Sequence, residues 1–231
     1  MKIKILGTRA EIEASAPYHS RHSGILIDNE ILIDLGEKEF LKYDPRHIFL
    51  THLHPDHAYF VESGENPEQK IYAPETKNFD NIEVIDEEKD FGYFKIAPVP
   101  THHSKRVDSQ AYIVEKDDSR ILYTGDLIWI NKEHHDKIGN VDLVITEASF
   151  LRKQGMIKRD EETGQIYGHA GIPRLIGLFS QFSSDIAFMH FGSWFYKDMK
   201  KGRRKFKELA KNNGLNLIVT YDGMEIDTEK L

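Results

Sequence analysis

The stretch Thr51-His52-Leu53-His54-Pro55-Asp56-His57 decides how this sequence is interpreted. It follows the apolar run 48–50, which is typical of a strand, so its polar side chains lie where a loop can fold around a cation. His52 and His54 are two positions apart and can point to one side in extended geometry, whereas Pro55 redirects the chain before Asp56 and His57. Imidazole nitrogen and carboxylate oxygen bind zinc, and also suit manganese or iron. The motif therefore predicts a metal site with room for a second ion.

Further ligand-type residues follow other predicted strands. Each of them comes at the C-terminal end of an apolar run, which is where α/β sheets place their sites. Taken singly, an aspartate after a glycine is typical of a turn, and a single histidine at a strand end is typical of a structural role. Their order behind the histidine motif favours a shared metal site. The residues are Asp34, His102 and His103, Asp126 and His190.

The composition limits the class of protein. The chain has 231 residues, 12 histidines and no cysteine, with 39% hydrophobic and 30% charged residues. Without cysteine there is no disulfide, thiolate metal site or cysteine nucleophile, and we expect a cytoplasmic protein. No apolar run approaches the ~20 residues that a bilayer span needs, so we expect no membrane association. Any metal site must use nitrogen and oxygen ligands.

Short apolar runs predict a strand-rich α/β protein. Strands dominate the first half and alternate with helices in the second, so we expect one domain over residues 1–231, built as a sandwich of two sheets covered by helices. Two tight turns are expected, at Asp28-Asn29-Glu30 and, between two hairpin strands, at Asp222-Gly223. Helices are expected over 170–182 and 197–213, the second capped by Gly214. The predicted strands are 2–6, 24–28, 31–35, 47–51, 70–73, 82–85, 93–99, 110–115, 120–124, 142–146, 186–190 and 215–221.

The histidine motif and the ligand-type residues around it, taken in their order along the chain, resemble those of the metallo-β-lactamase superfamily. The resemblance covers most of the chain and implies a four-layer αβ/βα sandwich with two divalent metal ions, zinc in the first instance, with manganese or iron as alternatives. It implies that Asp126 bridges the two ions and that Asp34 supports the ligands from behind. His103 is preferred over His102 because the phosphodiesterase branch of the family shows Pro-x-x-His-Ser, as at Pro100 to Ser104. By the same resemblance, one ion is held by His52, His54 and His103, and the other by Asp56, His57 and His190.

The resemblance also implies a reaction. A hydroxide that bridges two metals attacks phosphorus, and Asp56 orients it. The segment around Glu147, followed by Gly168-His169-Ala170, resembles ribonuclease Z-like phosphodiesterases, in which His169 would protonate the leaving oxygen and Glu147 would orient His169. A helix-capping role for His169 beside a buried Glu147 is the structural alternative. The expected enzyme is a metal-dependent phosphodiester hydrolase.

The substrate is less well defined. The sequence also resembles the branch that hydrolyses phosphoribosyl 1,2-cyclic phosphate, so we expect a small-molecule cyclic ribose phosphate, a nucleotide or an RNA phosphodiester. Hydrolysis of a carbon ester, lactone or thioester by the same metal site is the alternative. A homodimer is left open.

A basic segment lies near the C-terminus. Residues 197–211 carry a net charge of +6 in a chain of −7, which leaves −13 for the rest. The segment is typical of a solvated helix face, and a phosphate-binding patch is the functional alternative. Arg203, Arg204, Trp194 and Asp222 are the candidate substrate contacts, although the aromatic residue suits packing and Asp222 suits a turn.

Overall fold

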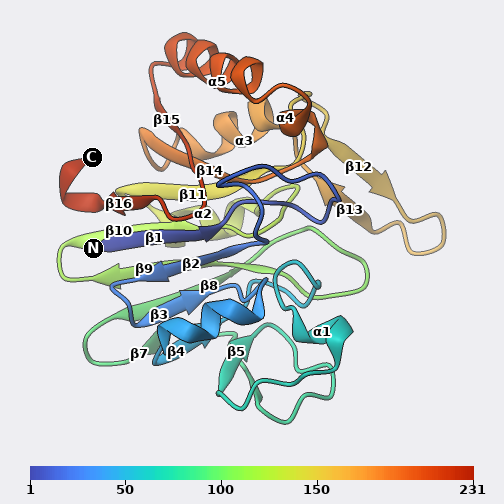
Figure 1. Ribbon diagram of the computed structural model, residues 1–231, viewed down its shortest axis with the longest axis vertical. Coiled ribbons are helices and arrows are strands. Elements are labelled where there is room, and N and C mark those ends of the chain that lie inside the picture. Colours follow the sequence, from blue (N-terminus) through green and yellow to red (C-terminus); the bar gives the residue numbers. More distant parts are fainter.

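Two seven-stranded sheets lie face to face in the computed structural model, which describes residues 1–231 (Figure 1). The first sheet contains, in spatial order, β16 (Glu225–Asp227), β1 (Lys2–Gly7), β2 (Gly24–Ile27), β3 (Ile31–Ile33), β4 (His47–Phe49), β5 (Ile71–Ala73) and β6 (Ile82–Val84). The second contains β15 (Asn216–Val219), β14 (Asp185–Phe191), β11 (Leu143–Ala148), β10 (Ser119–Tyr123), β9 (Gln110–Lys116), β8 (Lys95–Pro100) and β7 (Lys89–Asp90). A separate hairpin of β12 (Met156–Arg159) and β13 (Ile166–His169) projects from the body.

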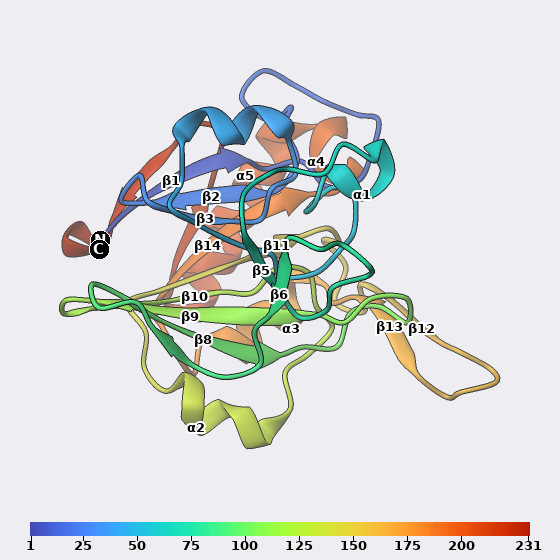
Figure 2. The ribbon, with the colours of Figure 1, turned by 90° about the horizontal axis from the view of Figure 1, so that it is seen from below.

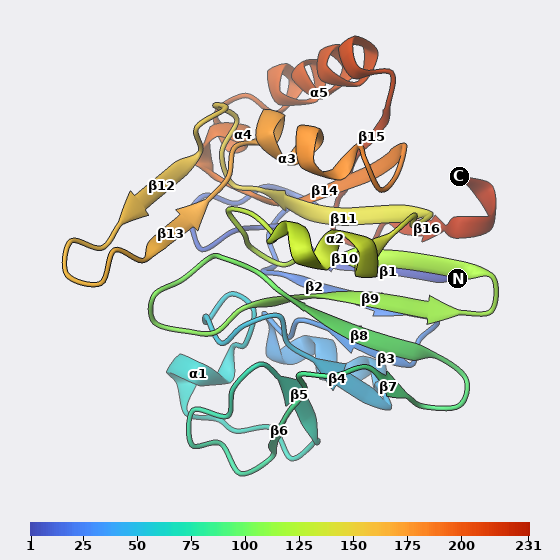
Figure 3. The same ribbon diagram turned by 180° about the vertical axis from the view of Figure 1, so that it is seen from behind.

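Helices cover the outer face of each sheet, so the molecule has four layers (Figures 2 and 3). The 3₁₀ helix η1 packs Phe40, and α1 packs Phe60, against the outer face of the first sheet. Phe179 of α3 and Phe206 of α5 do the same on the second sheet. The helices are η1 (Lys38–Tyr43), α1 (Phe60–Ser63), η2 (Lys132–His134), α2 (His135–Ile138), α3 (Ile172–Phe179), α4 (Ser193–Lys197), α5 (Met199–Asn213) and η3 (Thr228–Lys230). The expected αβ/βα sandwich is confirmed.

The central core lies between the two sheets. On β1 the side chains of Ile3 and Ile5 point into it, because alternate residues of a strand face the same side. Every residue of β11 is buried, as expected for a parallel strand covered on both faces. This packing holds the sheets in a fixed relation, and therefore also holds the loops at their edges. No helix combines the length and the apolar character that crossing a bilayer would require.

All the predicted strands are present, with ends shifted by a few residues. The turn at Asp28 and Asn29 is confirmed: both have positive φ and connect antiparallel strands β2 and β3. The hairpin predicted at Asp222-Gly223 is wrong, because β15 pairs with β14 in the second sheet and β16 pairs with β1 in the first. The turn is real, but it carries the chain from one sheet to the other.

Both predicted helices are present, but the range predicted for the second one includes the end of a separate helix. The helix predicted over 197–213 ends with Gly214 in the left-handed conformation, as expected, but it begins at Met199, because Asp198 caps its first turn through a hydrogen bond from the Lys201 amide. The preceding residues form the separate helix α4. The hairpin β12–β13 was not predicted, because its two short strands bury only Gly168 and show no apolar alternation.

Candidate metal centre and active site

Ligand-type side chains from three loops and one strand meet at one edge of the sandwich. The histidine motif follows β4, His103 follows β8 and Asp126 follows β10, while His190 lies near the end of β14. The structure brings them into two groups, and within each group the ligand atoms lie within 4.8 Å of one another; a third such group joins His103 and Asp126 to His169. The first group is His52, His54 and His103, and the second is Asp56, His57, Asp126 and His190.

Three imidazole nitrogens converge in the first group. His54 Nδ1 lies 3.1 Å from His52 Nε2 and 3.2 Å from His103 Nε2. Ligands about 2.05 Å from a tetrahedral zinc ion lie roughly 3.3 Å apart, so this spacing fits a shared ion. The Nδ1–H of His103 donates to the Gly168 carbonyl at 2.9 Å, which leaves the Nε2 lone pair for a metal. These residues therefore fit a divalent ion.

Burial keeps this group neutral. It lowers the pKa of His52 well below its usual range and the pKa of His103 to about 3. A neutral imidazole has a free lone pair, which metal binding needs.

The second group surrounds an imidazole nitrogen that has no partner. His57 donates from Nδ1 to Asp34 Oδ2 at 2.7 Å, so its Nε2 lone pair faces the centre of the group. That Nε2 is buried without a hydrogen bond, 3.5 Å from Asp126 Oδ2 and 3.8 Å from Asp56 Oδ2. A buried nitrogen without a partner beside two carboxylates fits a cation that all three ligate.

The buried Asp34 carboxylate contacts this group through His57. It accepts hydrogen bonds from His57, from the Tyr123 hydroxyl at 2.9 Å and from the Thr51 amide at 2.8 Å. Burial lowers the pKa of His57, but the negative charges of Asp34, Asp126 and Asp56 outweigh it and raise the pKa well above its usual range. Excess negative charge is therefore present where a cation would bind.

A β-bulge directs His190 into the site. In the pairing of β11 with β14, Glu147 lies opposite Met189 and Ala148 opposite Phe191, so His190 is the extra residue. Its φ is +53°, which is rare for a residue with a side chain. Bulges re-aim side chains in this way. His190 Nε2 thereby lies 2.8 Å from Asp56 Oδ2.

His169 and Glu147 form a pair beside the ligands. His169 Nδ1 lies 2.9 Å from Glu147 Oε2 and 3.8 Å from Asp126 Oδ2. The Leu127 amide also donates to Glu147, at 2.8 Å, and holds the carboxylate in place. Burial lowers the pKa of His169, but the Glu147 and Asp126 carboxylates outweigh it and raise the pKa to about 9. A protonated His169 is thus available near neutral pH.

A cavity of about 280 Å³ gives access to the ligands and to His169. Its wall includes Glu11 and apolar side chains from the N-terminal loop and from the segments next to β11 and β12, which the sequence did not single out. No lysine or arginine lines it. The sequence also missed Tyr123, which contacts Asp34, and Ser149, whose hydroxyl lies 3.0 Å from His190 Nδ1. Ser149 lies in the segment around Glu147, where the sequence assigns it no role, and Tyr123 belongs to no local motif, so only the tertiary structure shows their contacts.

The four candidate substrate contacts lie outside this cavity. Arg203 contacts His19 at 3.0 Å from Nη2 to Nε2, and Asp222 accepts hydrogen bonds from the Thr8 hydroxyl at 2.7 Å and from the amides of residues 20 and 21. Their polar groups thus tie the N-terminal loop to the C-terminal half. Trp194 and Arg204 instead line a neighbouring cavity.

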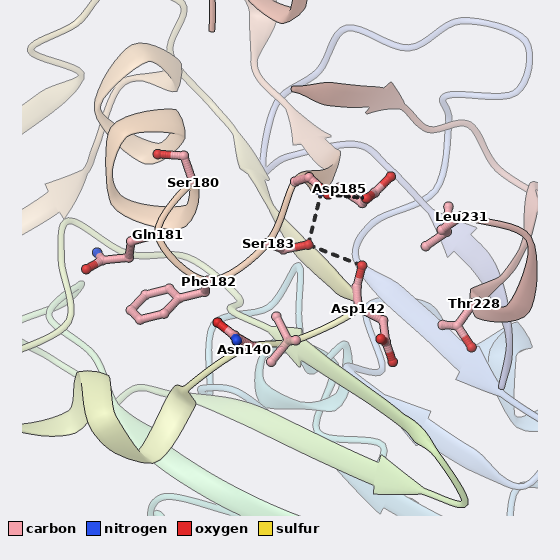
Figure 4. A pocket seen from close by; sticks show the side chains of 11 residues that line it. Asn140, Asp142, Ser180, Gln181, Phe182, Ser183, Asp185, Thr228 and Leu231 are labelled. Atoms are coloured by element: carbon pink, nitrogen blue, oxygen red, sulfur yellow. Dashed lines mark hydrogen bonds between the residues drawn. The ribbon is translucent and has the colours of Figure 1, made fainter. Parts of the chain in front are cut away.

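Another cavity lies at the opposite edge of the second sheet (Figure 4). It measures about 460 Å³ and is formed at the N-terminal ends of β11 and β14. Its side chains bond to one another and to the chain around them: Ser183 donates to the Asp142 carbonyl and Asn216 to Asp185. It contains no histidine, whereas four histidines line the first cavity: His54, His103, His169 and His190.

The family model described as "Beta-lactamase superfamily domain" matches residues 42–190. The chain belongs to this superfamily. The match contains the histidine motif 51–57 and ends at His190. No curated protein matches the sequence.

Solved structures show the same metallo-β-lactamase fold. The chain is similar to the metallo-β-lactamase fold protein YhfI from Bacillus subtilis, with 18% identity, a TM-score of 0.69, and coverage of 97% of this chain and 98% of that one. It is similar to the short form of human tRNase Z at 17% identity and TM-score 0.63, with 99% of both chains covered. It is also similar to an isothiocyanate hydrolase from Delia radicum gut bacteria at 14% identity and TM-score 0.63, with 98% of this chain and 100% of that one covered.

Proposed function

We propose that the protein is a metal-dependent hydrolase that cleaves phosphodiesters. The observation that carries the proposal is the His169–Glu147 pair: a proton donor lies in the same cavity as the two ligand groups. When bound, two divalent ions, zinc in the first instance, supply a hydroxide near neutral pH and neutralise developing negative charge. The residues of the chain must then bind the substrate, orient it and move protons.

Two side chains that line the cavity have different tasks. Asp56 faces the interior with a carboxylate held by His190 at 2.8 Å, and can accept a proton from the attacking water. His169 lines the same cavity. Its Nδ1–H is held by Glu147, so its Nε2–H is left to contact a phosphate oxygen and to protonate the departing alkoxide. Glu147 keeps His169 oriented and positively charged, and is a positioning residue.

The charge of the cavity wall favours a diester over a phosphomonoester. A diester carries one negative charge and a monoester close to two at neutral pH. The wall has no lysine or arginine, and it includes the carboxylate of Glu11. A second negative charge on the substrate would therefore have no protein cation to meet beyond His169. Protonated His169 matches the single charge of a phosphodiester.

A carbon ester or lactone is the second candidate. The observation in its favour is the apolar part of the wall, which Ile12, Phe150 and Met156 form and which would accept an uncharged substrate. In that reaction His169 has no phosphate charge to meet. The tRNase Z and isothiocyanate hydrolase structures share the fold with this chain, so the test includes both phosphodiesters and substrates without a phosphate.

The test combines a substrate panel with one pair of variants. Protein of measured metal content is assayed on cyclic nucleotides, cyclic ribose phosphates, precursor tRNA, short RNA, bis(p-nitrophenyl) phosphate, an aryl ester and a lactone. We expect His169→Ala to lower kcat on diesters with alkoxide leaving groups by about 10²–10⁴-fold, because that leaving group needs a proton. The loss on bis(p-nitrophenyl) phosphate is smaller, because nitrophenolate leaves without one. The metal content is unchanged.

His102→Ala is the matched control. His102 is the neighbour of a predicted ligand, but it lies outside the site cavity and stacks on Trp129 at 4.4 Å between ring centroids. Its activity should stay within twofold of the wild type. Turnover of the aryl ester or lactone with none of any diester, by protein with two metals bound, would refute the phosphodiesterase proposal.

A further inference from the structure

We propose that the cavity beside α4 and α5 is a second phosphate-binding site, which holds the backbone of a single-stranded oligonucleotide next to the scissile bond. This inference rests on the proposed phosphodiesterase function and names its substrate class. The cavity measures about 690 Å³ and is lined by Leu151 and by residues 194–208 of the two helices.

The lining of this basic cavity carries positive charge that no protein group neutralises. Lys197, Lys201 and Arg204 form no ion pair and no side-chain hydrogen bond within the chain. The two carboxylates of the lining are already engaged: Asp198 caps α5, and Glu208 pairs with Lys205. Three exposed cations therefore converge on one cavity in a protein of net charge −7. Charge complementarity favours an anion with several charges.

The basic cavity adjoins the site cavity through two shared segments. In the first segment, Phe150 lines the site cavity and Leu151 lines the basic cavity. In the second, Ser193 lines the site cavity and Trp194 lines the basic cavity. Consecutive Cα atoms lie about 3.8 Å apart, so neighbouring residues of each segment line the two spaces. The Trp194 indole is held in this wall by a hydrogen bond to the Ala148 carbonyl at 2.9 Å. A chain that leaves the site cavity over this wall enters the basic cavity.

The two cavities divide the charges of such a substrate. The site cavity has no lysine or arginine and contains Glu11, so it suits a single phosphodiester. The basic cavity has the cations for the following phosphates, and the half-buried Trp194 ring offers a face for a base. A cyclic ribose phosphate has no group that reaches the second cavity. The structure therefore favours an oligonucleotide over a small cyclic substrate.

Two triple variants test this site. The first replaces Lys197, Lys201 and Arg204 with alanine. The second replaces Lys200, Lys207 and Lys211, which lie on α5 outside the cavity. It removes the same number of positive charges as the first. All six side chains are exposed, so both variants should fold. Binding of a fluorescein-labelled 12-nucleotide phosphorothioate RNA is measured by anisotropy at several salt concentrations, on metal-loaded protein.

We expect the first variant to raise the Kd for this RNA tenfold or more and the second to change it less than twofold. The slope of log K against log salt should become less negative by about 2 in the first variant, for three lost phosphate contacts. The ratio of kcat/KM for RNA to that for bis(p-nitrophenyl) phosphate should fall at least tenfold in the first variant only.

Equal weakening in both triple variants, or no RNA binding by the wild type, would overturn the second site. Equally tight binding of poly-glutamate would overturn the choice of a nucleic acid. The two proposals fail separately, because RNA binding is measured without turnover. RNA binding with no diester turnover contradicts the proposed function, and diester turnover without RNA binding contradicts only the second site.

Discussion

The contacts of His19 predict how the stability of the folded protein changes at acidic pH. The ring is buried, with Nδ1 2.9 Å from the Thr8 hydroxyl and Nε2 3.0 Å from Arg203 Nη2. The Thr8 hydroxyl donates to Asp222, so it accepts from Nδ1–H, and Nε2 must accept from the guanidinium. His19 is therefore neutral in the folded protein. Burial and then the charge of Arg203 lower its pKa from 6.5 to about 4.

The sign and size of the effect follow from the two pKa values. Between pH 4 and 6.5 the unfolded chain binds a proton at His19 that the folded chain does not, so stability falls as the pH falls through this window. The whole shift of about 2.5 units corresponds to about 3 kcal/mol. Between pH 7.5 and 5 the loss is about 2 kcal/mol. The network ties down the N-terminal loop that carries Glu11, so acid should also loosen one wall of the site cavity.

The assay is urea unfolding of metal-free wild type and His19→Gln at pH 5, 6 and 7.5. Glutamine does not titrate, so the difference in unfolding free energy between the two proteins should shrink by about 2 kcal/mol from pH 7.5 to 5. Carboxylates and metal ligands titrate in both proteins and cancel in the difference. His102→Gln, at a half-exposed position, serves as the control and should follow the wild-type curve. Parallel curves for wild type and His19→Gln would refute the reasoning.

Two further predictions concern the support of the metal site. Asp34→Asn removes the charge that orients His57, so the metal affinity should fall about 10–100-fold in competition with a chromogenic chelator. The control Asp222→Asn changes a carboxylate outside the site, and its metal affinity should stay within twofold of the wild type. An equal loss of affinity in both variants would contradict the orienting role. Gly125→Ala places a Cβ 2.5 Å from Thr51 Oγ1 at a residue whose φ is +57°. The Tm of this variant in thermal unfolding should therefore fall further than the Tm of Gly223→Ala. Gly223 also has a positive φ, but open space surrounds it. A smaller shift for Gly125→Ala would show that Thr51 can move.

Much of the fold could be predicted because most of its strands are visible in the sequence as short apolar runs. Apolar runs of four to seven residues marked the main strands, and Gly214 marked the end of α5. The hairpin β12–β13 shows no such run, because its strands bury little surface. The turn at Asp222-Gly223 was recognisable, but the sheet that each flanking strand joins was not. Turn chemistry is local, whereas β16 joins the first sheet because Ile226 is buried between the sheets there.

The sequence by itself determined the type of chemistry in the site. Metal binding needs nitrogen and oxygen donors after strand ends, and the spacing of His52, His54, Asp56 and His57 supplies four of them within one loop. Only the tertiary structure decided what holds these donors and what lies beside them. Tyr123 contacts Asp34 from 89 residues away, and a bulge turns His190 inward. Arg203 binds His19, while its neighbour Arg204 faces a cavity, because adjacent residues on a helix point in different directions. Residue types set the reaction that is available, and the packing of distant strands sets which side chains take part.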